Sequence, residues 1–291
     1  MNGKNHPVLS GESKMDSKYS KMINPEYMKK IESWFKNYVH QFTSSDRNYN
    51  QNIKLKKDHT YRVCEEIIRV GESLNLSHDD LNLAKTIALL HDVGRFIQYD
   101  LYQTFDDEKS EDHAELSIKV IRKEGILKGI DKSTNRIIFF AINHHNKAYL
   151  SKHEFARPLF FAKLLRDADK LDIFYVITKY YHNKDEHTNK AIELDLLDTP
   201  QISDRVYKDL ISRKIVKFKY IENLNDLKLL QMAWIYDINF PITFQLIKER
   251  KYLEKIREVL PDSDKSQKAY KAVRNYLEVR CNQNKKKVPD S

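Results

Sequence analysis

The stretch ALLHDVGR, residues 88–95, decides how the chain is interpreted. It continues an apolar helical pattern, because at about 100° per residue one stripe carries Ala84, Ile87 and His91. His91 therefore lies on the face that a helix turns toward a protein core, and Asp92 follows it in the last turn. We expect this helix to end at Gly94, because glycine often terminates helices.

The composition around this stretch favours helices. The chain has 291 residues, of which 41% are hydrophobic, and only six are Gly and seven Pro. That apolar content is too high for a disordered protein, and the scarcity of turn residues argues against a β-sandwich or barrel. We predict an all-α fold.

The two cysteines and the lack of long apolar runs indicate the compartment. Cys64 and Cys281 are too few for a thiolate zinc site or a disulfide scaffold. The first residues contain no apolar run as long as that of a signal peptide, and no apolar run in the chain is as long as a membrane helix. We expect a soluble cytoplasmic protein with no membrane partner.

The excess of positive charge does not by itself indicate a binding partner. Lys and Arg number 51 against 42 Asp and Glu, which gives a net charge of +9. Part of the excess lies in scattered N-terminal lysines and in residues 285–287, where a solvated tail is the simplest explanation. The pattern argues against a nucleic-acid partner and leaves acidic small molecules such as phosphate esters open.

Capping residues and apolar spacing place further helices along the chain. Asn24-Pro25 is typical of a helix start, and Ser77 and Ser110 are expected to cap two later helices. The other helices are expected at about 53–74, 133–145, 158–181 and within 204–280. A short strand or hairpin is possible over Ile215 to Ile221, where charged and apolar residues alternate.

Several ionisable residues fall in helices that also carry apolar stripes. They are His59, His91, Asp92, His113, His144, His145 and Asp169. Burying this many polar groups without compensation is costly. A divalent metal would offset that cost, because imidazole and carboxylate are good ligands for iron, manganese, zinc and related cations.

Helix geometry separates the acids of LLRDADKLD, residues 164–172. Asp169 and Asp172 share a face with Ala162 and Leu165, whereas Asp167 is offset from Asp169 by roughly 160°. We therefore expect Asp169 to point inward and Asp167 to point elsewhere. Asp172 is either an acceptor that orients a metal-bound histidine or water, or a residue of the helix surface.

These motifs resemble those of the HD superfamily of metal-dependent phosphohydrolases. The resemblance covers about residues 50–181 and rests on HTYRV at His59, ALLHDVGR at His91-Asp92 and LLRDADKLD at Asp169. It implies an HD-domain helical bundle over 25–200, after a flexible lead-in over 1–24. A mainly helical C-terminal region would span 201–281, with a basic flexible tail over 282–291.

The resemblance also implies a ligand set and an activity. His59, His91, Asp92 and Asp169 match the basic metal set, and His113, His144 and His145 match the extra histidines of two-metal branches such as the HD-GYP phosphodiesterases and di-iron oxygenases. The implied activity is the hydrolysis of a phosphate ester, which would be a nucleotide or a related small molecule. A divalent metal (Fe, Mn, Co, Ni or Zn) would activate the attacking water, and Asp92 would be the catalytic residue that anchors the metal. The resemblance leaves open whether the site holds one metal ion or two and whether the protein forms a homodimer.

Two departures from the family and two rival functions limit this interpretation. No Gly-Tyr-Pro follows His145, so the feature associated with cyclic-di-GMP cleavage is missing. Arg95 stands where one nucleotidase branch has an acid. Arg62, Arg95, Lys147 and Lys170 are candidates to bind substrate phosphate by their proximity to the ligands. The alternatives are a di-iron oxygenase and a non-catalytic HD sensor that binds a nucleotide.

Overall fold

The computed structural model describes residues 23–150, 154–183 and 189–285. Over these ranges the chain is helical and contains no strand, apart from an isolated bridge between Leu197 and Asn223. The predicted all-α class is therefore confirmed. Residues 1–22, most of the predicted lead-in, and 286–291, most of the predicted tail, lie outside the described residues.

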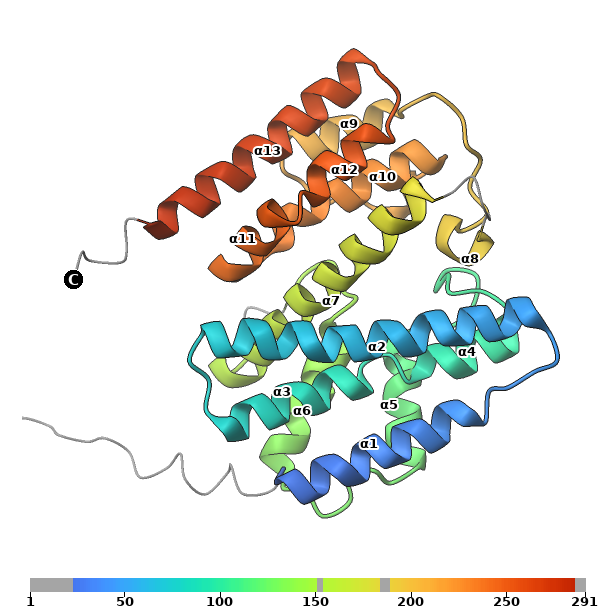
Figure 1. Ribbon diagram of the computed structural model, residues 1–291, viewed down its shortest axis with the longest axis vertical. Coiled ribbons are helices and arrows are strands. Elements are labelled where there is room, and N and C mark those ends of the chain that lie inside the picture. Colours follow the sequence, from blue (N-terminus) through green and yellow to red (C-terminus); the bar gives the residue numbers. More distant parts are fainter. Residues whose placement is uncertain (1–22, 151–153, 184–188, 286–291) are drawn as a thin grey trace, which may run out of the picture.

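The first seven helices form one group around two long helices (Figure 1). α2 packs against α3 and α7, α6 packs against α7, and α4 packs against α5. The bounds are α1 Pro25–His40, α2 Arg47–Ser73, α3 His78–Leu90, α4 Gly94–Tyr102, α5 His113–Lys123, α6 Lys132–His144 and α7 Ala156–His182.

The remaining helices form a second group around the C-terminal half of α7. In Figure 1, α7 passes from the first group into this one, and α11 and α12 pack directly on it. Phe174 of α7 stacks on Tyr252 with ring centroids 5.6 Å apart. The bounds are α8 Lys190–Glu193, α9 Asp204–Ile211, η2 Phe218–Tyr220, α10 Leu224–Ala233, η3 Trp234–Asp237, α11 Pro241–Glu249, α12 Tyr252–Glu258 and α13 Asp264–Lys285.

Local signals place two helix starts correctly and one incorrectly. The side chains of Asn24 and Ser77 accept hydrogen bonds from the backbone of Tyr27 and Asp80, as N-cap residues do. The prediction for Ser110 is wrong. Asp112 caps α5 instead, and Ser110 accepts a hydrogen bond from Gln98.

Gly94 starts a helix where we expected an end. α3 stops at Leu90, residues 91–93 form a turn, and Gly94 is the first residue of α4. A Cβ at Gly94 would lie 2.5 Å from the carbonyl oxygen of His113 and 2.4 Å from the backbone nitrogen of Ser117. Glycine is required here because α4 begins in contact with the backbone of α5.

The predicted strand over Ile215 to Ile221 is absent. Val216 is buried, and Phe218 to Tyr220 form a short 3₁₀ helix. Within the described ranges no neighbouring strand offers a ladder of hydrogen bonds to this segment. Alternation alone therefore does not establish a strand.

Asp167 is buried, and the expectation that it points away from the interior is wrong. Its carboxylate accepts hydrogen bonds from the backbone of Asn239 and Phe240 and from the Asn239 side chain, at 2.8 to 3.1 Å. Burial raises the pKa of Asp167 to about 6. The expectation from helix geometry holds for a helix that packs against a single core on one face. α7 instead lies between two groups of helices, so that both of its faces are buried. Asp167 thus fixes the second group to α7.

We predict that Asp167→Ala lowers the free energy of unfolding by about 2 kcal/mol, because buried backbone donors lose their acceptor. Urea denaturation checks this value. Glu258→Ala, which removes an exposed carboxylate, should change stability by less than about 0.5 kcal/mol. Equal effects of the two substitutions would exclude the anchoring role of Asp167.

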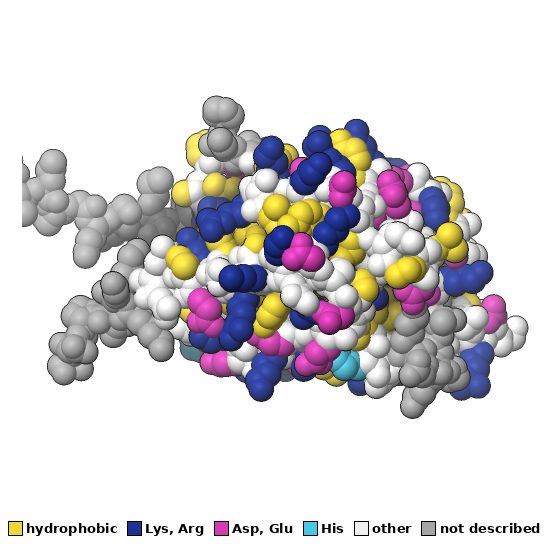
Figure 2. Space-filling view, turned by 90° about the horizontal axis from the view of Figure 1, so that it is seen from above, with side chains coloured by type: hydrophobic (Ala, Val, Ile, Leu, Met, Phe, Trp, Pro, Cys, Tyr) yellow, Lys and Arg dark blue, Asp and Glu magenta, His cyan; other side chains and the backbone are white. Residues whose placement is uncertain are grey.

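No helix among the described residues is long and apolar enough to cross a membrane. The face in Figure 2 carries acidic side chains among the basic ones, with hydrophobic side chains between them. This face is therefore not a continuous basic surface.

Candidate metal centre

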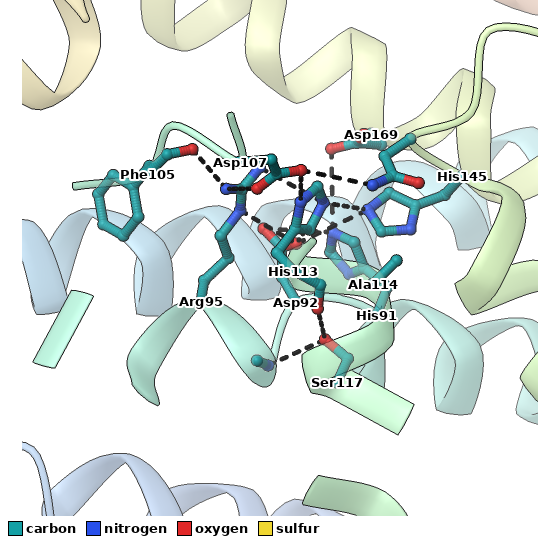
Figure 3. A network of polar contacts seen from close by, with 12 residues as sticks. His91, Asp92, Arg95, Phe105, Asp107, His113, Ala114, Ser117, His145 and Asp169 are labelled. Atoms are coloured by element: carbon teal, nitrogen blue, oxygen red, sulfur yellow. Dashed lines mark hydrogen bonds and ion pairs between the residues drawn. The ribbon is translucent and has the colours of Figure 1, made fainter. Parts of the chain in front are cut away.

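Imidazole and carboxylate side chains from five parts of the chain converge between α2, α5 and α7. His59 comes from α2, His113 begins α5, and Asp169 comes from α7. His91 and Asp92 follow α3, and His145 follows α6. Figure 3 shows His91, Asp92, His113, His145 and Asp169 pointing toward one another. Three groups of donor atoms each lie within 4.8 Å of one another. Two join ligands across the cluster, His59 with His91 and Asp169, and His91 with Asp92 and His145, and the third joins His113 to Asp107 and Asp112.

The Nδ1 atom of each of these histidines has an oxygen partner. His59 contacts Asp172 at 2.6 Å and His113 contacts Asp107 at 2.6 Å. The partners of His91 and His145 are the carbonyl oxygens of Ala88 and Ile142, at 2.6 and 2.7 Å. Because a carbonyl or carboxylate only accepts, Nδ1 carries the proton. When such a ring is neutral, its lone pair is therefore on Nε2, which faces the cluster.

Asp92 stands between two pairs of histidines. Its Oδ2 lies 3.5 Å from Nε2 of His59 and 3.7 Å from Nε2 of His91. Its Oδ1 lies 3.5 Å from Nε2 of His113 and 3.7 Å from Nε2 of His145. One carboxylate thus faces two sets of nitrogen donors.

Buried atoms of the cluster need a partner that the chain does not supply. Nε2 of His91 and Oδ1 of Asp92 are buried without a hydrogen-bond partner. Nε2 of His113 and Nε2 of His145 lie 2.9 Å apart. On rings that carry their proton on Nδ1, neither Nε2 atom can donate to the other, and only that of His113 has a donor of the chain nearby, Nη2 of Arg95. A divalent ion would satisfy all of these atoms. The donor set therefore fits a metal ion bound by imidazole and carboxylate.

The pKa values follow the local charges. Burial and Lys56 disfavour the charged form of His59, but Asp169, Asp172 and Asp92 outweigh them and raise its pKa to about 10. Burial lowers the pKa of His91 to about 4. For Asp92, burial opposes ionisation, but Lys56 and the histidines hold its pKa well below the usual range. The carboxylate of Asp92 is therefore ionised at neutral pH, as a metal ligand must be, whereas His59 is protonated and would lose its Nε2 proton on binding a metal ion.

Two cations lie at the edge of the cluster. Nζ of Lys56 is 3.0 Å from Oδ2 of Asp92, and Nη2 of Arg95 is 3.3 Å from Nε2 of His113. Arg95 donates hydrogen bonds to the carbonyl oxygen of Phe105 and to Asp107 (Figure 3). It also donates one to the side chain of Gln98. The sequence analysis missed Lys56 and Asp107. Lys56 precedes His59 by three residues on α2, a spacing that places both on one face.

His144 is not brought to the cluster. Its Nδ1 contacts the carbonyl oxygen of Phe140 at 2.9 Å, and its ring stacks on Phe140. The donor groups contain His145 but not His144. α6 ends at His144, and the chain turns there, so that His145 faces inward.

The cluster opens into a cavity of about 830 Å³ that both groups of helices line. Three of the four phosphate candidates, Arg95, Lys147 and Lys170, line it. Arg62 does not line this cavity and instead binds Asp172 through Nε and Nη2. The second group of helices contributes Trp234, Tyr236 and Asp237 among others.

Arg166 joins this wall to the histidine and aspartate cluster. Its Nη1 donates to the carbonyl oxygens of His144, His145 and Lys147 at 2.5 to 3.0 Å. Its Nη2 donates to Asp237, which also binds Lys170 at 2.7 Å. Sequence reasoning could not identify this residue, because its partners lie up to 71 positions away.

A comparison with protein families agrees with the site. Residues 57–198 match the model of the HD domain family. Neither a curated protein nor a solved structure matches the chain. The match begins just before His59 and ends beyond Asp169, so that it contains the whole cluster. The chain therefore contains an HD domain, over residues 57–198.

Proposed function

We propose that the chain hydrolyses a phosphate ester of a small organic molecule, such as a nucleotide, at a centre of divalent metal. The ligands would be His59, His91, Asp92, His113, His145 and Asp169. The observation that carries this proposal is the position of Asp92, whose two oxygens face two pairs of imidazole Nε2 atoms. That placement supports two ions rather than one.

A divalent ion bound there would lower the pKa of a coordinated water and neutralise charge on the phosphoryl oxygens. The residues of the chain prepare the site for this. Asp172, Asp107 and two backbone carbonyls fix the imidazole rings with Nε2 toward the cluster. Lys56 and Arg95 place positive charge beside Asp92, where phosphoryl oxygens would bind.

The cavity has room for the organic part of such an ester. Its volume of about 830 Å³ is within the range of small-molecule sites. Ile173, Val216, Leu230 and Trp234 form an apolar part of its lining. A nucleobase or another flat apolar group would bury its surface against these side chains.

The positive lining favours hydrolysis of an anionic ester over oxygen chemistry on a neutral substrate. Nine lysine and arginine residues line the cavity, against three aspartates, of which Asp92 and Asp169 belong to the donor set. A di-iron oxygenase would use the same donors, and a sensor would bind the nucleotide without turnover. Both remain outcomes of the test.

The test is phosphate release from a panel of nucleotides and generic phosphate esters. The purified chain is stripped with a chelator and reloaded with Mn, Fe, Co, Ni or Zn. We expect release that requires metal and that the chelator abolishes. Consumption of oxygen by the reduced iron form would favour the oxygenase. Nucleotide binding without turnover under every metal would favour the sensor.

We predict that Asp172→Asn weakens Mn²⁺ binding about 10- to 100-fold, because His59 loses the charged acceptor of its Nδ1 proton. Calorimetric titration of the stripped chain with Mn²⁺ measures this. Asp58→Asn serves as a control, since Asp58 pairs with the exposed Lys54 on the same helix as His59. If Asp172→Asn binds Mn²⁺ as wild type does, then Asp172 has no part in orienting His59.

A further inference from the structure

Three lysines of the cavity have no acidic partner. Lys163 belongs to α7, and Lys214 and Lys217 belong to the segment between α9 and η2. Across the described ranges none of the three forms an ion pair within 4.0 Å, although all three line the cavity that contains Asp92 and Asp169. Segment 212–217 lies outside the residues that match the HD family.

The other cations of the cavity are already neutralised or held elsewhere. Lys56 faces Asp92, and Arg95 and Lys147 bind Asp107 and Asp112. Arg166 and Lys170 share Asp237. The guanidinium of Arg213 lies over the ring of Tyr276, 5.3 Å from its centroid.

This distribution leaves an excess of positive charge away from the cluster. Asp92 and Asp169 would be occupied by metal, so they would not neutralise the lysines. Concave sites lined by one sign of charge concentrate the field that attracts a ligand of opposite sign. One phosphoryl group at the cluster would leave the three lysines without a counter-charge.

The backbone holds these lysines in position. Lys163 lies six residues before Asp169, a rise of about 9 Å along α7, so that it faces another part of the cavity. Val216 is 3% exposed and anchors its segment to the core. The backbone nitrogen of Lys214 donates to the carbonyl oxygen of Asp209 at 2.9 Å. Lys214 and Lys217 are thus presented from a fixed segment rather than from a free loop.

We propose that the cavity binds an organic ester with at least two phosphate groups, one at the histidine and aspartate cluster and another on Lys163, Lys214 and Lys217. The C-terminal helices would then select the substrate, while the HD domain supplies the reaction. This inference rests on the proposed function only in one respect, the hydrolysis of the phosphate group that binds at the histidine and aspartate cluster. Its binding component can be measured without turnover.

The experiment compares two inorganic probes, tripolyphosphate and orthophosphate, by calorimetry on the full chain as purified, at constant ionic strength. Wild type should bind tripolyphosphate at least ~10-fold more tightly than orthophosphate. The double variant Lys214→Gln/Lys217→Gln should lose at least ~10-fold in tripolyphosphate affinity and less than ~2-fold in orthophosphate affinity. Lys163→Gln should act in the same direction.

The control is Lys208→Gln/Lys219→Gln, which removes the same charge from two exposed lysines outside the cavity lining. It should change both affinities by less than ~2-fold. Equal losses in the two double variants would show a general charge effect and overturn the proposal. Equal binding of the two probes by wild type would overturn it as well. Circular dichroism verifies that each variant is folded.

Asp92→Ala separates this inference from the proposed function. If the variant loses phosphate release but retains lysine-dependent tripolyphosphate binding, both proposals are supported. If wild type hydrolyses no ester under any metal, the proposed function fails. The lysine variants still decide the binding of polyphosphate in that case.

Discussion

Asp92→Ala is expected to lower kcat/KM for phosphate release at least ~10³-fold and to remove most of the bound metal. Within residues 23–150, 154–183 and 189–285, Asp92 alone has a carboxylate that contacts both pairs of histidines. Its removal would leave Nε2 of His113 and His145 without a facing carboxylate, and would leave only Asp169 beside Nε2 of His59 and His91. The loss should therefore exceed that of any residue that only orients a ligand.

Steady-state assays and metal analysis of the same preparations measure these two effects. Glu72→Ala is the control, because Glu72 is an exposed acid on α2 and its removal should leave both values within ~2-fold of wild type. Full activity of Asp92→Ala would rule out the cluster as the site of reaction. Lost activity with metal retained in full would show that Asp92 acts on substrate rather than as a ligand.

Gly94→Ala is expected to lower the free energy of unfolding by at least about 3 kcal/mol, because a new Cβ would overlap backbone atoms that cannot move alone. The nearest atoms are the backbone nitrogen of Ser117 at 2.4 Å and the carbonyl oxygen of His113 at 2.5 Å. The backbone nitrogen of Gly94 also donates to the hydroxyl of Ser117 at 2.9 Å. Relief of the overlap requires α5 to shift, and His113 would move with it.

Urea denaturation measures the loss of stability, and calorimetry measures the weaker metal binding that accompanies it. Gly71→Ala is the matched control, since its Cβ would meet only side-chain ends, that of Leu81 at 2.7 Å and that of Leu76 at 3.2 Å. These side chains can rotate away, so we expect a change below about 1 kcal/mol. A Gly94→Ala protein as stable as Gly71→Ala would show that the contact between α4 and α5 is not tight.

The sequence alone predicts the parts of the site that depend on local helical geometry. Apolar spacing places His59 and Asp169 on inward faces, and Asn24 and Ser77 begin their helices as expected. The sequence also locates Asp172, although it leaves open what that residue contacts. The structure brings it to His59, which is 113 positions away.

The parts that the sequence does not predict depend on contacts between distant segments. Gly94 has the local signal of a helix end, and its actual role depends on the backbone of α5. Asp167 lies on the side of α7 opposite Asp169, where a polar residue is expected to face solvent. Its burial is explained only by the second group of helices, whose backbone donates to its carboxylate. Of the adjacent His144 and His145, helical spacing favours neither, because the helix ends between them. The cavity lysines of segment 212–217 carry no motif at all.

Elemental analysis of the purified chain tests the central claim most directly. The claim is that the six histidine and aspartate ligands form one centre of divalent metal in which Asp92 faces two ions. It predicts about two equivalents of first-row transition metal per chain in wild type and less than ~0.2 in Asp92→Ala. A wild-type chain that holds no metal after purification and reconstitution, or an Asp92→Ala chain with the same metal content as wild type, would contradict it.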